Sequence, residues 1–248
     1  MGLKESGLRG SLRNVSVGIV AIPDDVTDQL PLDEGSGTTA ANAVSNRDFG
    51  IEGASWKSGS DGRGGHYLST DGVDDRLINT DDVEDFGGLT SWSFSVWIEA
   101  TEPSDRAHII RIGDDDLLTA TDSLAWGSFY NEREGTLTAK SHDGSNRDEV
   151  EVDEGEFFDA GINQLGVRWE ANNTMDIIKN GSVIQSESVS NVSEVGIGDM
   201  DTVTVAGPGG GSDRFLDADF LDEVSFGLDE FWSESTFLEI YDSHPSTS

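Results

Sequence analysis

The chain has 248 residues, of which 49 are Asp or Glu and 15 are Lys or Arg, so its formal net charge is −34. Self-repulsion of this size opposes a compact fold unless salt screens it, and at molar salt the screening length falls to about 3 Å. The composition therefore indicates a protein of a salt-rich cytoplasm or brine; it disfavours nucleic acid as a partner, and the absence of cysteine excludes disulfides, thiolate zinc sites and cysteine nucleophiles.

Residues 1–22 differ from the rest of the chain in charge. Their basic residues are Lys4, Arg9 and Arg13. Only Glu5 opposes them, so this segment carries +2 and the remainder carries −36. The segment lacks the apolar core of a signal peptide, and no apolar run in the chain is long enough to span a bilayer. We therefore expect an N-terminal attachment arm over residues 1–22, followed by one domain over residues 23–248, with no signal peptide and no membrane insertion.

The chain beyond the arm has a β pattern. Short apolar or alternating runs recur between clusters of Gly, Asn and Asp. The run from Trp92 to Ile98 alternates, which places Trp92, Phe94, Val96 and Ile98 on one face and Trp97 on the other. Asn180-Gly181 is a strong signal for a two-residue hairpin turn. The expected strands are residues 15–22, 92–98, 108–112, 165–169, 174–179, 182–185 and 220–226.

One short helix is predicted near the C-terminus. Ser233 is a suitable N-cap, and Pro245 prevents the helix from continuing. Its expected apolar stripe consists of Phe237, Leu238, Ile240 and Tyr241. Because no helices alternate with the strands, a parallel sheet is disfavoured. The sequence therefore predicts an all-β, two-sheet antiparallel sandwich with a short C-terminal helix.

Several stretches occur in the order found in laminin-G-like, concanavalin A-like jelly-roll domains. The similar stretches are residues 32–41, 53–56, 67–75, 92–98, 180–181, 221–224 and 235–241. Among them, Asp71-Gly72-Val73-Asp74-Asp75 resembles a turn of that family, with Thr70 where Phe is usual. The resemblance implies a jelly-roll sandwich, but it says less about function because this fold carries lectins, adhesins, glucanases and passive spacers.

A second resemblance concerns the arm. Residues 9–15, followed by Ile22-Pro23-Asp24, are similar to a leader before such domains in head or tail proteins of tailed viruses of salt-loving archaea. This resemblance implies a non-enzymatic virion protein, such as a capsid or tail decoration, turret or spike, that serves host attachment. It would be made in the host cytoplasm and docked through its arm onto a capsid or tail protein. Monomer, trimer and pentamer all stay open as oligomeric states.

Calcium is the cofactor that the jelly-roll resemblance implies. Related domains hold a structural Ca²⁺ between the opening segment and the last strand, and calcium prefers six to eight oxygen ligands. By position, the resemblance points to Asp222 and Asn42, together with Asp33. Asn42 stands where the family more often has Asp, which would lower the affinity. No other cofactor is expected.

Two alternative functions stay open. The first is a carbohydrate-binding or adhesin module of a cell surface, with Trp126, Phe129 or Tyr130 as residues that could stack on a sugar. The second is a glycoside hydrolase that uses Glu151 and Asp153, which alternation places on one face of a strand. Because about a fifth of the chain is acidic, such a carboxylate motif arises readily by chance. We therefore expect a non-enzyme.

Two further motifs carry no chemistry in this interpretation. The glycine-rich residues 207–211 lack the Lys-Ser/Thr ending of a phosphate-binding loop. The histidines are His66, His108, His142 and His244. None of them has a catalytic or metal-binding motif around it, so each is expected to be a surface or structural residue.

Overall fold

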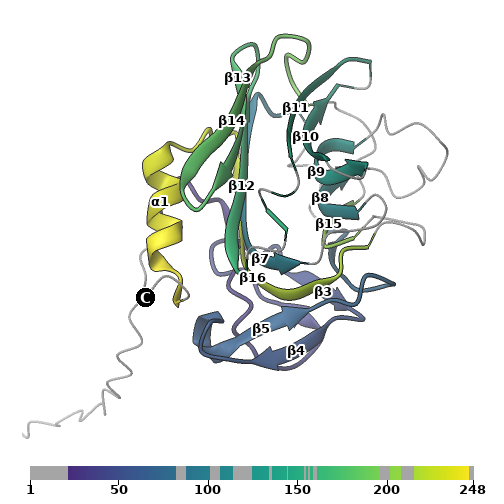
Figure 1. Cartoon of the computed structure of the whole chain (residues 1–248), viewed down its shortest axis with the longest axis vertical. Helices are drawn as coiled ribbons and strands as arrows, with labels where there is room; N and C mark the ends of the chain where they lie inside the picture. Colours follow the sequence, from purple (N-terminus) through teal and green to yellow (C-terminus); the bar gives the residue numbers. More distant parts are fainter. Residues whose placement is uncertain are drawn as a thin grey trace, which may run out of the picture.

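The computed structural model describes residues 22–81, 88–100, 107–113, 125–133, 136–143, 145–153, 155, 157–158, 161–195, 202–207 and 215–245. Within these ranges the chain is a sandwich of two eight-stranded sheets with one α-helix near the C-terminus (Figure 1). All pairings between the described strands are antiparallel. The predicted all-β fold class is confirmed.

Sheet A lies between the helix and the second sheet. Its strands are, in spatial order, β14 (Ser182–Ser188), β13 (Thr174–Lys179), β12 (Asn163–Glu170), β7 (Ser91–Ala100), β16 (Ala218–Leu228), β5 (His66–Ser69) and β4 (Ser55–Ser58). The short strand β1 (Asp28–Leu30) also pairs with β16. A single 3₁₀ turn, η1 (Arg63–Gly65), precedes β5. The edges of this sheet are therefore β14 and β4.

Sheet B forms the other layer of the sandwich. Its strands are, in spatial order, β11 (Arg147–Asp153), β10 (Thr136–His142), β9 (Ala125–Arg133), β8 (Ala107–Gly113), β15 (Thr202–Val205), β6 (Arg76–Asn79), β3 (Phe49–Glu52) and β2 (Thr39–Ala40). Strands distant in sequence lie side by side, such as β15 between β8 and β6. The two sheets thus draw on both halves of the chain.

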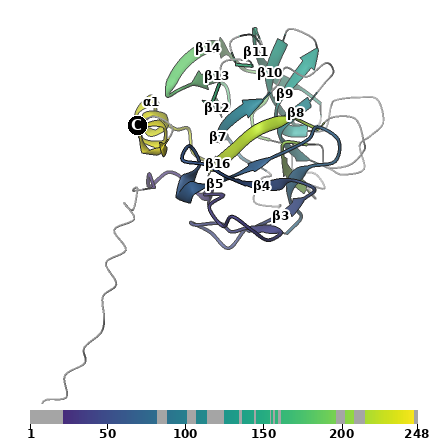
Figure 2. The same ribbon diagram turned by 60° about the horizontal axis from the view of Figure 1, so that its bottom comes forward.

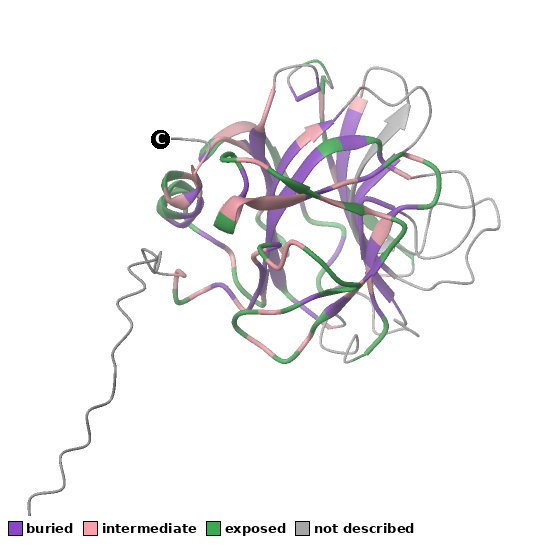
Figure 3. Cartoon of the chain, turned by 90° about the horizontal axis from the view of Figure 1, so that it is seen from below, coloured by how far each residue is buried: buried purple, intermediate pink, exposed green. Residues whose placement is uncertain are grey.

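The hydrophobic core lies between the two sheets, and Figure 3 shows the buried residues concentrated on their strands. Phe94 and Trp169 of sheet A belong to one cluster with Leu137 and Val203 of sheet B. All four side chains are fully buried. Burial of one such side chain contributes about 1.5–3 kcal/mol, so this shared core joins the two sheets into one unit.

The central strand β7 confirms the predicted alternation. Trp92, Phe94, Val96 and Ile98 belong to the core cluster. Trp97 lies on the opposite face, where its ring stacks on Tyr241 and His244 at centroid distances of 5.3 and 4.1 Å. The strand is therefore covered on both faces, by sheet B on one side and by the C-terminal segment on the other.

The predicted hairpin turn is present between β13 and β14. Asn180 and Gly181 have φ angles of 50° and 77°, as a tight turn with two left-handed residues requires. The turn also joins β12, because Asn180 Oδ1 accepts from the Gln164 backbone N–H at 2.9 Å. The expected strands at residues 92–98, 108–112, 165–169, 174–179, 182–185 and 220–226 all fall within observed strands. Residues 15–21 of the remaining one lie outside the described residues.

Helix α1 (Glu234–Ser243) covers the outer face of sheet A (Figure 2). Ser233 caps it as predicted, since its side chain accepts from the Thr236 backbone N–H. Phe237 and Ile240 are buried against the sheet, and a Cβ at Gly166 of β12 would lie only 2.5 Å from the Phe237 ring. Leu238 is less buried than predicted: it lies over the β13–β14 turn, where a Cβ at Gly181 would be 2.5 Å from its Cδ2, and it stays 41% exposed. None of the described helices could span a membrane.

Candidate functional site

A groove opens at the side of the sandwich where β11 and β14 are the outermost strands. These two strands lie side by side (Figure 1). Among the described residues, β11 pairs only with β10 and β14 only with β13, so each presents one unpaired edge. The groove has a volume of about 600 Å³. Its polar lining includes Arg147, Glu149, Glu151, Glu187, Ser190 and Asn191.

The buried carboxylate of Asp148 fixes the floor of this groove. It accepts hydrogen bonds from Trp169 Nε1 at 3.1 Å, from the Asn191 backbone N–H at 3.0 Å and from the Val192 backbone N–H at 3.3 Å. These bonds tie β11 of sheet B to β12 of sheet A and to the segment that follows β14. Hydrogen bonds to a charged group are among the stronger ones in proteins, so the two walls of the groove are held at a fixed separation.

The rim of the groove is negatively charged. Glu149, Glu151 and Glu187 line it, and the only cation among the lining residues is Arg147. Arg147 Nε lies 3.2 Å from Glu149 Oε2, and both side chains are at least one-third exposed. Such an exposed ion pair is worth at most about 1 kcal/mol. The groove therefore suits ligands that bring positive charge or hydrogen-bond donors.

The two carboxylates considered for hydrolysis lie on this same strand. Glu151 and Asp153 pair with Thr138 and Thr136 of β10, so they share one face as alternation predicted. Both are exposed, at the edge of sheet B. Glycoside hydrolysis needs two carboxyl groups that flank a bound sugar. Glu151 and Asp153 instead lie side by side on the exposed face of one edge strand.

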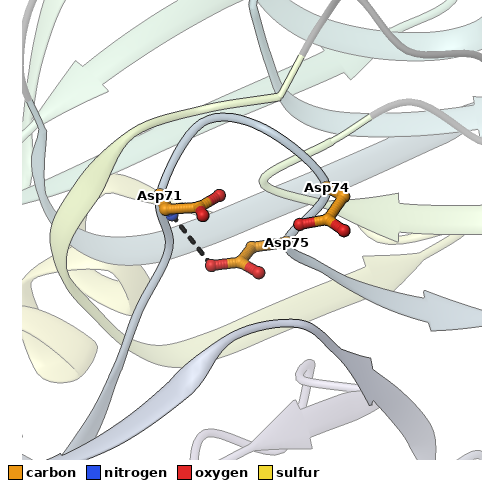
Figure 4. A group of neighbouring side chains, drawn as sticks. All are labelled: Asp71, Asp74 and Asp75. Carbon is orange, nitrogen blue, oxygen red and sulfur yellow. Dashed lines mark hydrogen bonds between the residues drawn. The ribbon is translucent and has the colours of Figure 1, made fainter.

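Three acids of the turn between β5 and β6 converge, as Figure 4 shows. The carboxylate oxygens of Asp71, Asp74 and Asp75 lie within 4.8 Å of one another. The turn already uses two of them: Asp75 accepts from the Asp71 backbone N–H at 2.9 Å, and Asp71 accepts from the Val73 backbone N–H at 2.9 Å. Burial raises the pKa of Asp75, while the bond from Asp71 opposes that rise. These contacts give Asp71 and Asp75 a structural role in the turn.

Asp222, the first calcium candidate, is fully buried in a cluster of charged side chains. Its carboxylate accepts from the Arg63 backbone N–H at 2.6 Å and from the Glu223 backbone N–H at 3.0 Å. His244 Nε2 lies 3.0 Å from the same carboxylate. Burial lowers the pKa of His244 to about 3, helped by the nearby Arg63 charge. Burial therefore favours the neutral imidazole, and a hydrogen bond between its Nε2 and the Asp222 carboxyl group joins the two side chains.

Glu223, next to Asp222, faces a different set of partners. Its Oε1 accepts from Arg63 Nη2 at 2.8 Å and from Gln29 Nε2 at 2.9 Å. Its other oxygen, Oε2, is buried and has no hydrogen-bond partner among the described residues, and the same holds for Gln29 Oε1. Burial raises the pKa of Glu223 to about 7, although the Arg63 charge and hydrogen bond lower it. Arg63 thus supplies the cation that compensates two adjacent buried acids.

Asn42, the second calcium candidate, belongs to another network. Its Nδ2 donates to Asp28 Oδ1 at 2.7 Å, and its Oδ1 accepts from the backbone N–H groups of Gln29, Val44 and Ser45. Asp28 also accepts from Arg47 Nη1 and Ser45 Oγ, each at 2.5 Å. The structure therefore directs the Asn42 side chain to Asp28 instead of Asp222.

Asp33, the third candidate, packs against η1. A Cβ at Gly64 would lie 2.8 Å from Asp33 Cβ, next to Arg63. Because the oxygens of Asp222 and Asn42 already accept protein donors in separate networks, a cation bound by all three residues would have to displace these bonds. Calcium at this site stays a prediction, which a fall in melting temperature on chelation at constant high salt would support and an unchanged melting temperature would contradict.

The remaining predicted site residues are distributed as follows. Lys4, Arg9 and Arg13 of the arm, and residues 208–211 of the glycine-rich segment, lie outside the described residues. Trp126, Phe129 and Tyr130 belong to β9, of which the structure describes the backbone only. His66 is half-buried, whereas His108 and His142 are buried on sheet B. Burial lowers the pKa of His142, although Asp143 opposes this effect.

Comparison with solved structures supports the fold. No protein-family model and no curated protein sequence matches the chain. The receptor-binding domain of botulinum neurotoxin C/D mosaic serotype is similar with a TM-score of 0.63 and 14% identity, over 88% of this chain and 51% of that one. The botulinum neurotoxin serotype D ligand-binding domain, solved with N-acetylneuraminic acid, is similar with a TM-score of 0.62 and 12% identity. The match covers 88% of this chain and 51% of that one.

A third similar structure is the binding domain of botulinum neurotoxin DC in complex with rat synaptotagmin II. It gives a TM-score of 0.62 and 11% identity, over 89% of this chain and 52% of that one. The chain thus spans about half the length of each of these domains. At such low identity the similarity establishes a shared β-sandwich fold and not a shared ligand.

Proposed function

We propose that this chain is a non-catalytic binding module. The observation that carries the proposal is the groove between β11 and β14, a concave polar surface whose walls are held apart by Asp148. The similar solved structures include a receptor-binding domain, a ligand-binding domain with N-acetylneuraminic acid and a binding domain with rat synaptotagmin II, which supports a binding role for the fold. The carboxylates and hydroxyls of the groove suit a hydroxyl-rich glycan, since sugar hydroxyls donate hydrogen bonds to them.

We further propose that the module is displayed on the virion of a haloarchaeal virus, where glycan binding would serve host attachment. Three sequence features support this setting: the net charge of −34, the basic residues of the arm, and the resemblance of residues 9–15 and 22–24 to a viral leader. A cell-surface adhesin with the same groove is the alternative. In both settings the domain over residues 23–248 binds the ligand, and the arm attaches the domain to the particle or to the cell surface.

The glycan proposal predicts that the paired change Glu151→Gln and Glu187→Gln weakens binding about thirtyfold, since the two lost charge-assisted bonds are together worth roughly 2 kcal/mol. Calorimetry with host envelope glycans at molar salt measures the effect. Glu239→Gln on the exposed side of α1 is the matched control and should bind normally. The proposal would be overturned if no glycan bound, or if glycan were hydrolysed and Glu151→Gln abolished that hydrolysis.

The virion proposal predicts that deletion of residues 1–16 leaves a folded, soluble domain that no longer joins particles. The expected reason is that the basic residues of the arm contact an acidic capsid or tail protein. Mass spectrometry of purified particles measures the copy number of the full chain and of the truncated chain. Normal incorporation of the truncated chain would exclude the arm as the attachment segment.

A further inference from the structure

A row of buried polar side chains crosses the outer face of sheet A, the face that α1 covers. Gln29 of β1 pairs with Ser225 of β16, and Ser225 pairs with Ser95 of β7, so these residues are direct neighbours on adjacent strands. Ser95 points away from the core, because Phe94 and Val96 on either side of it are core residues. Gln29 Nε2 lies 3.5 Å from Ser225 Oγ, so these two side chains share a face as well. The row is therefore a polar patch enclosed beneath the C-terminal segment.

Three oxygen atoms of this patch are buried and have no hydrogen-bond partner among the described residues: Gln29 Oε1, Ser95 Oγ and Glu223 Oε2. Two of them belong to side chains that are already joined, because Gln29 Nε2 donates to Glu223 Oε1 at 2.9 Å. A buried polar atom without a partner is costly, and native proteins contain few of them. Three such oxygens in one patch therefore indicate a bound ligand that these atoms contact.

The backbone of β16 directs Glu223 into this patch. The pairing of β16 with β7 shifts its register between Asp222 and Ser225, and Glu223 has a φ angle of 43°, which residues other than glycine rarely adopt. A regular strand turns consecutive residues to opposite faces, whereas here Asp222 and Glu223 both bind Arg63. Strained backbone of this kind persists where the surrounding structure enforces it, and it is frequent at ligand sites.

The charges around the patch do not balance when both acids are deprotonated. Asp222 and Glu223 are fully buried, and Arg63 is the cation that contacts them among the described residues. His244 adds no charge at neutral pH, since burial lowers its pKa to about 3. Burial raises the pKa of both acids, as expected for two buried carboxyl groups that share one cation. The remaining negative charge therefore needs a second cation or a proton.

A monovalent metal ion fits these atoms better than a water molecule or a divalent ion. Carboxylate and amide oxygens are the ligands that hard cations prefer. A water could donate to these oxygens and accept from Trp97 Nε1, which is also buried without a partner among the described residues, but it would leave the charge uncompensated. Ca²⁺ prefers six to eight oxygen ligands, which is more than the patch offers, and its second charge would exceed the one that needs compensation.

We propose that Glu223 Oε2, Gln29 Oε1 and Ser95 Oγ bind one sodium or potassium ion on the outer face of sheet A. The site is distinct from the calcium candidates, because the oxygens of Asp222 and Asn42 accept hydrogen bonds from other donors. It is also independent of the groove and goes beyond the proposed binding function. The stability of the domain then depends on salt in two ways: salt screens the surface charge, and its cation fills one site of the folded chain.

Thermal unfolding of the full chain at pH 8 in molar sodium, potassium or choline chloride, each with a chelator of divalent ions, tests this proposal. The three salts screen surface charge equally at equal concentration, but choline is too large to enter the site. For a site filled about tenfold beyond half-saturation, we expect a melting temperature about 3–6 °C higher in sodium or potassium chloride than in choline chloride. The salt with the larger effect identifies the preferred ion.

Two variants separate binding at the site from general effects of the salts. Glu223→Gln keeps the size of the side chain and removes its charge, so it should abolish the difference between the salts. Ser95→Ala should lower the melting temperature in sodium or potassium chloride and not in choline chloride. If its hydroxyl bound no ligand, removal of this unpaired buried group would leave stability unchanged or raise it in every salt. Glu239→Gln, on the exposed side of α1, is the matched control and should keep the full difference.

Three results would overturn the inference. Equal melting temperatures in the three salts would show that a water or a proton, and not a metal ion, satisfies the buried oxygens. A salt difference that is the same in Glu223→Gln as in the unmodified protein would show that the cations act elsewhere on the chain. Stabilisation that requires added Ca²⁺ and disappears with the chelator would assign the site to a divalent ion.

Discussion

Replacement of Arg63 by alanine should destabilise the domain by about 3–5 kcal/mol at pH 8, because it leaves buried Glu223 without its cation. The backbone N–H of residue 63 would still donate to Asp222. The lost free energy of unfolding therefore measures the contribution of the Arg63 side chain alone. At pH 5 the loss should be smaller, since Glu223, with a pKa of about 7, is then protonated and needs no counter-ion. Urea unfolding at constant molar salt and at both pH values measures these differences.

The matched control for Arg63→Ala is Arg147→Ala. Arg147 also pairs with a glutamate, Glu149, but its side chain is 55% exposed, whereas that of Arg63 is 17% exposed. An exposed pair contributes at most about 1 kcal/mol, and molar salt weakens it further. Equal and small effects of the two replacements would show that Arg63 does not compensate a buried charge.

The sequence predicted the strands well where one local pattern determined them. Trp92 to Ile98 alternates because one face packs on sheet B and the other on the C-terminal segment, and both requirements act on consecutive residues. Asn180-Gly181 specifies its turn through two positive φ angles. Helical spacing placed Leu238 correctly beside the apolar stripe, but it does not predict how much of a side chain its neighbours cover, and Leu238 stays 41% exposed.

The buried charge cluster could not be predicted from local patterns. Arg63 and Glu223 are 160 residues apart in sequence, and only the folding of η1 against β16 brings them together. His244 was expected to be a surface or structural residue, and stacking on Trp97 and a hydrogen bond to Asp222 fix it in the interior as a structural one. The sequence signal that could have pointed to them is Asp222-Glu223 between Leu221 and Val224 of one strand, because acids in a buried strand need partners.

The groove was missed for a different reason. Its residues come from β11, from β14 and from residues 189–191 after β14, so no single motif contains them. In a chain with 49 acidic residues, Glu149, Glu151 and Glu187 also have no distinction by composition. Only the fold distinguishes these three acids, because it places them around one groove beside the buried carboxylate of Asp148, which holds the walls apart.

Replacement of Glu223 and of His244 by glutamine should change the pH dependence of stability in opposite directions. Glu223 has a folded pKa of about 7 against an ordinary value of 4.5, so its contribution is fully present below pH 4.5 and is lost as the pH rises through 7. His244 has a folded pKa of about 3 against 6.5, so its contribution is present above pH 6.5 and is lost as the pH falls towards 3.

Between pH 4.5 and 6.5 these two contributions oppose each other, because the folded protein holds the proton on Glu223 while the unfolded chain holds it on His244. Burial also raises the pKa of Asp222, so the contribution of Asp222 to stability depends on pH in the same direction as that of Glu223. Arg63 stays charged throughout. Relative to the unmodified protein, Glu223→Gln should therefore lose stability on acidification over this range, and His244→Gln should lose it as the pH rises. Each change should approach about 3 kcal/mol across the range, since one pKa unit corresponds to about 1.4 kcal/mol. Urea unfolding at constant salt from pH 4.5 to 8 measures both slopes, and parallel curves for all three proteins would show that neither group changes its pKa on folding.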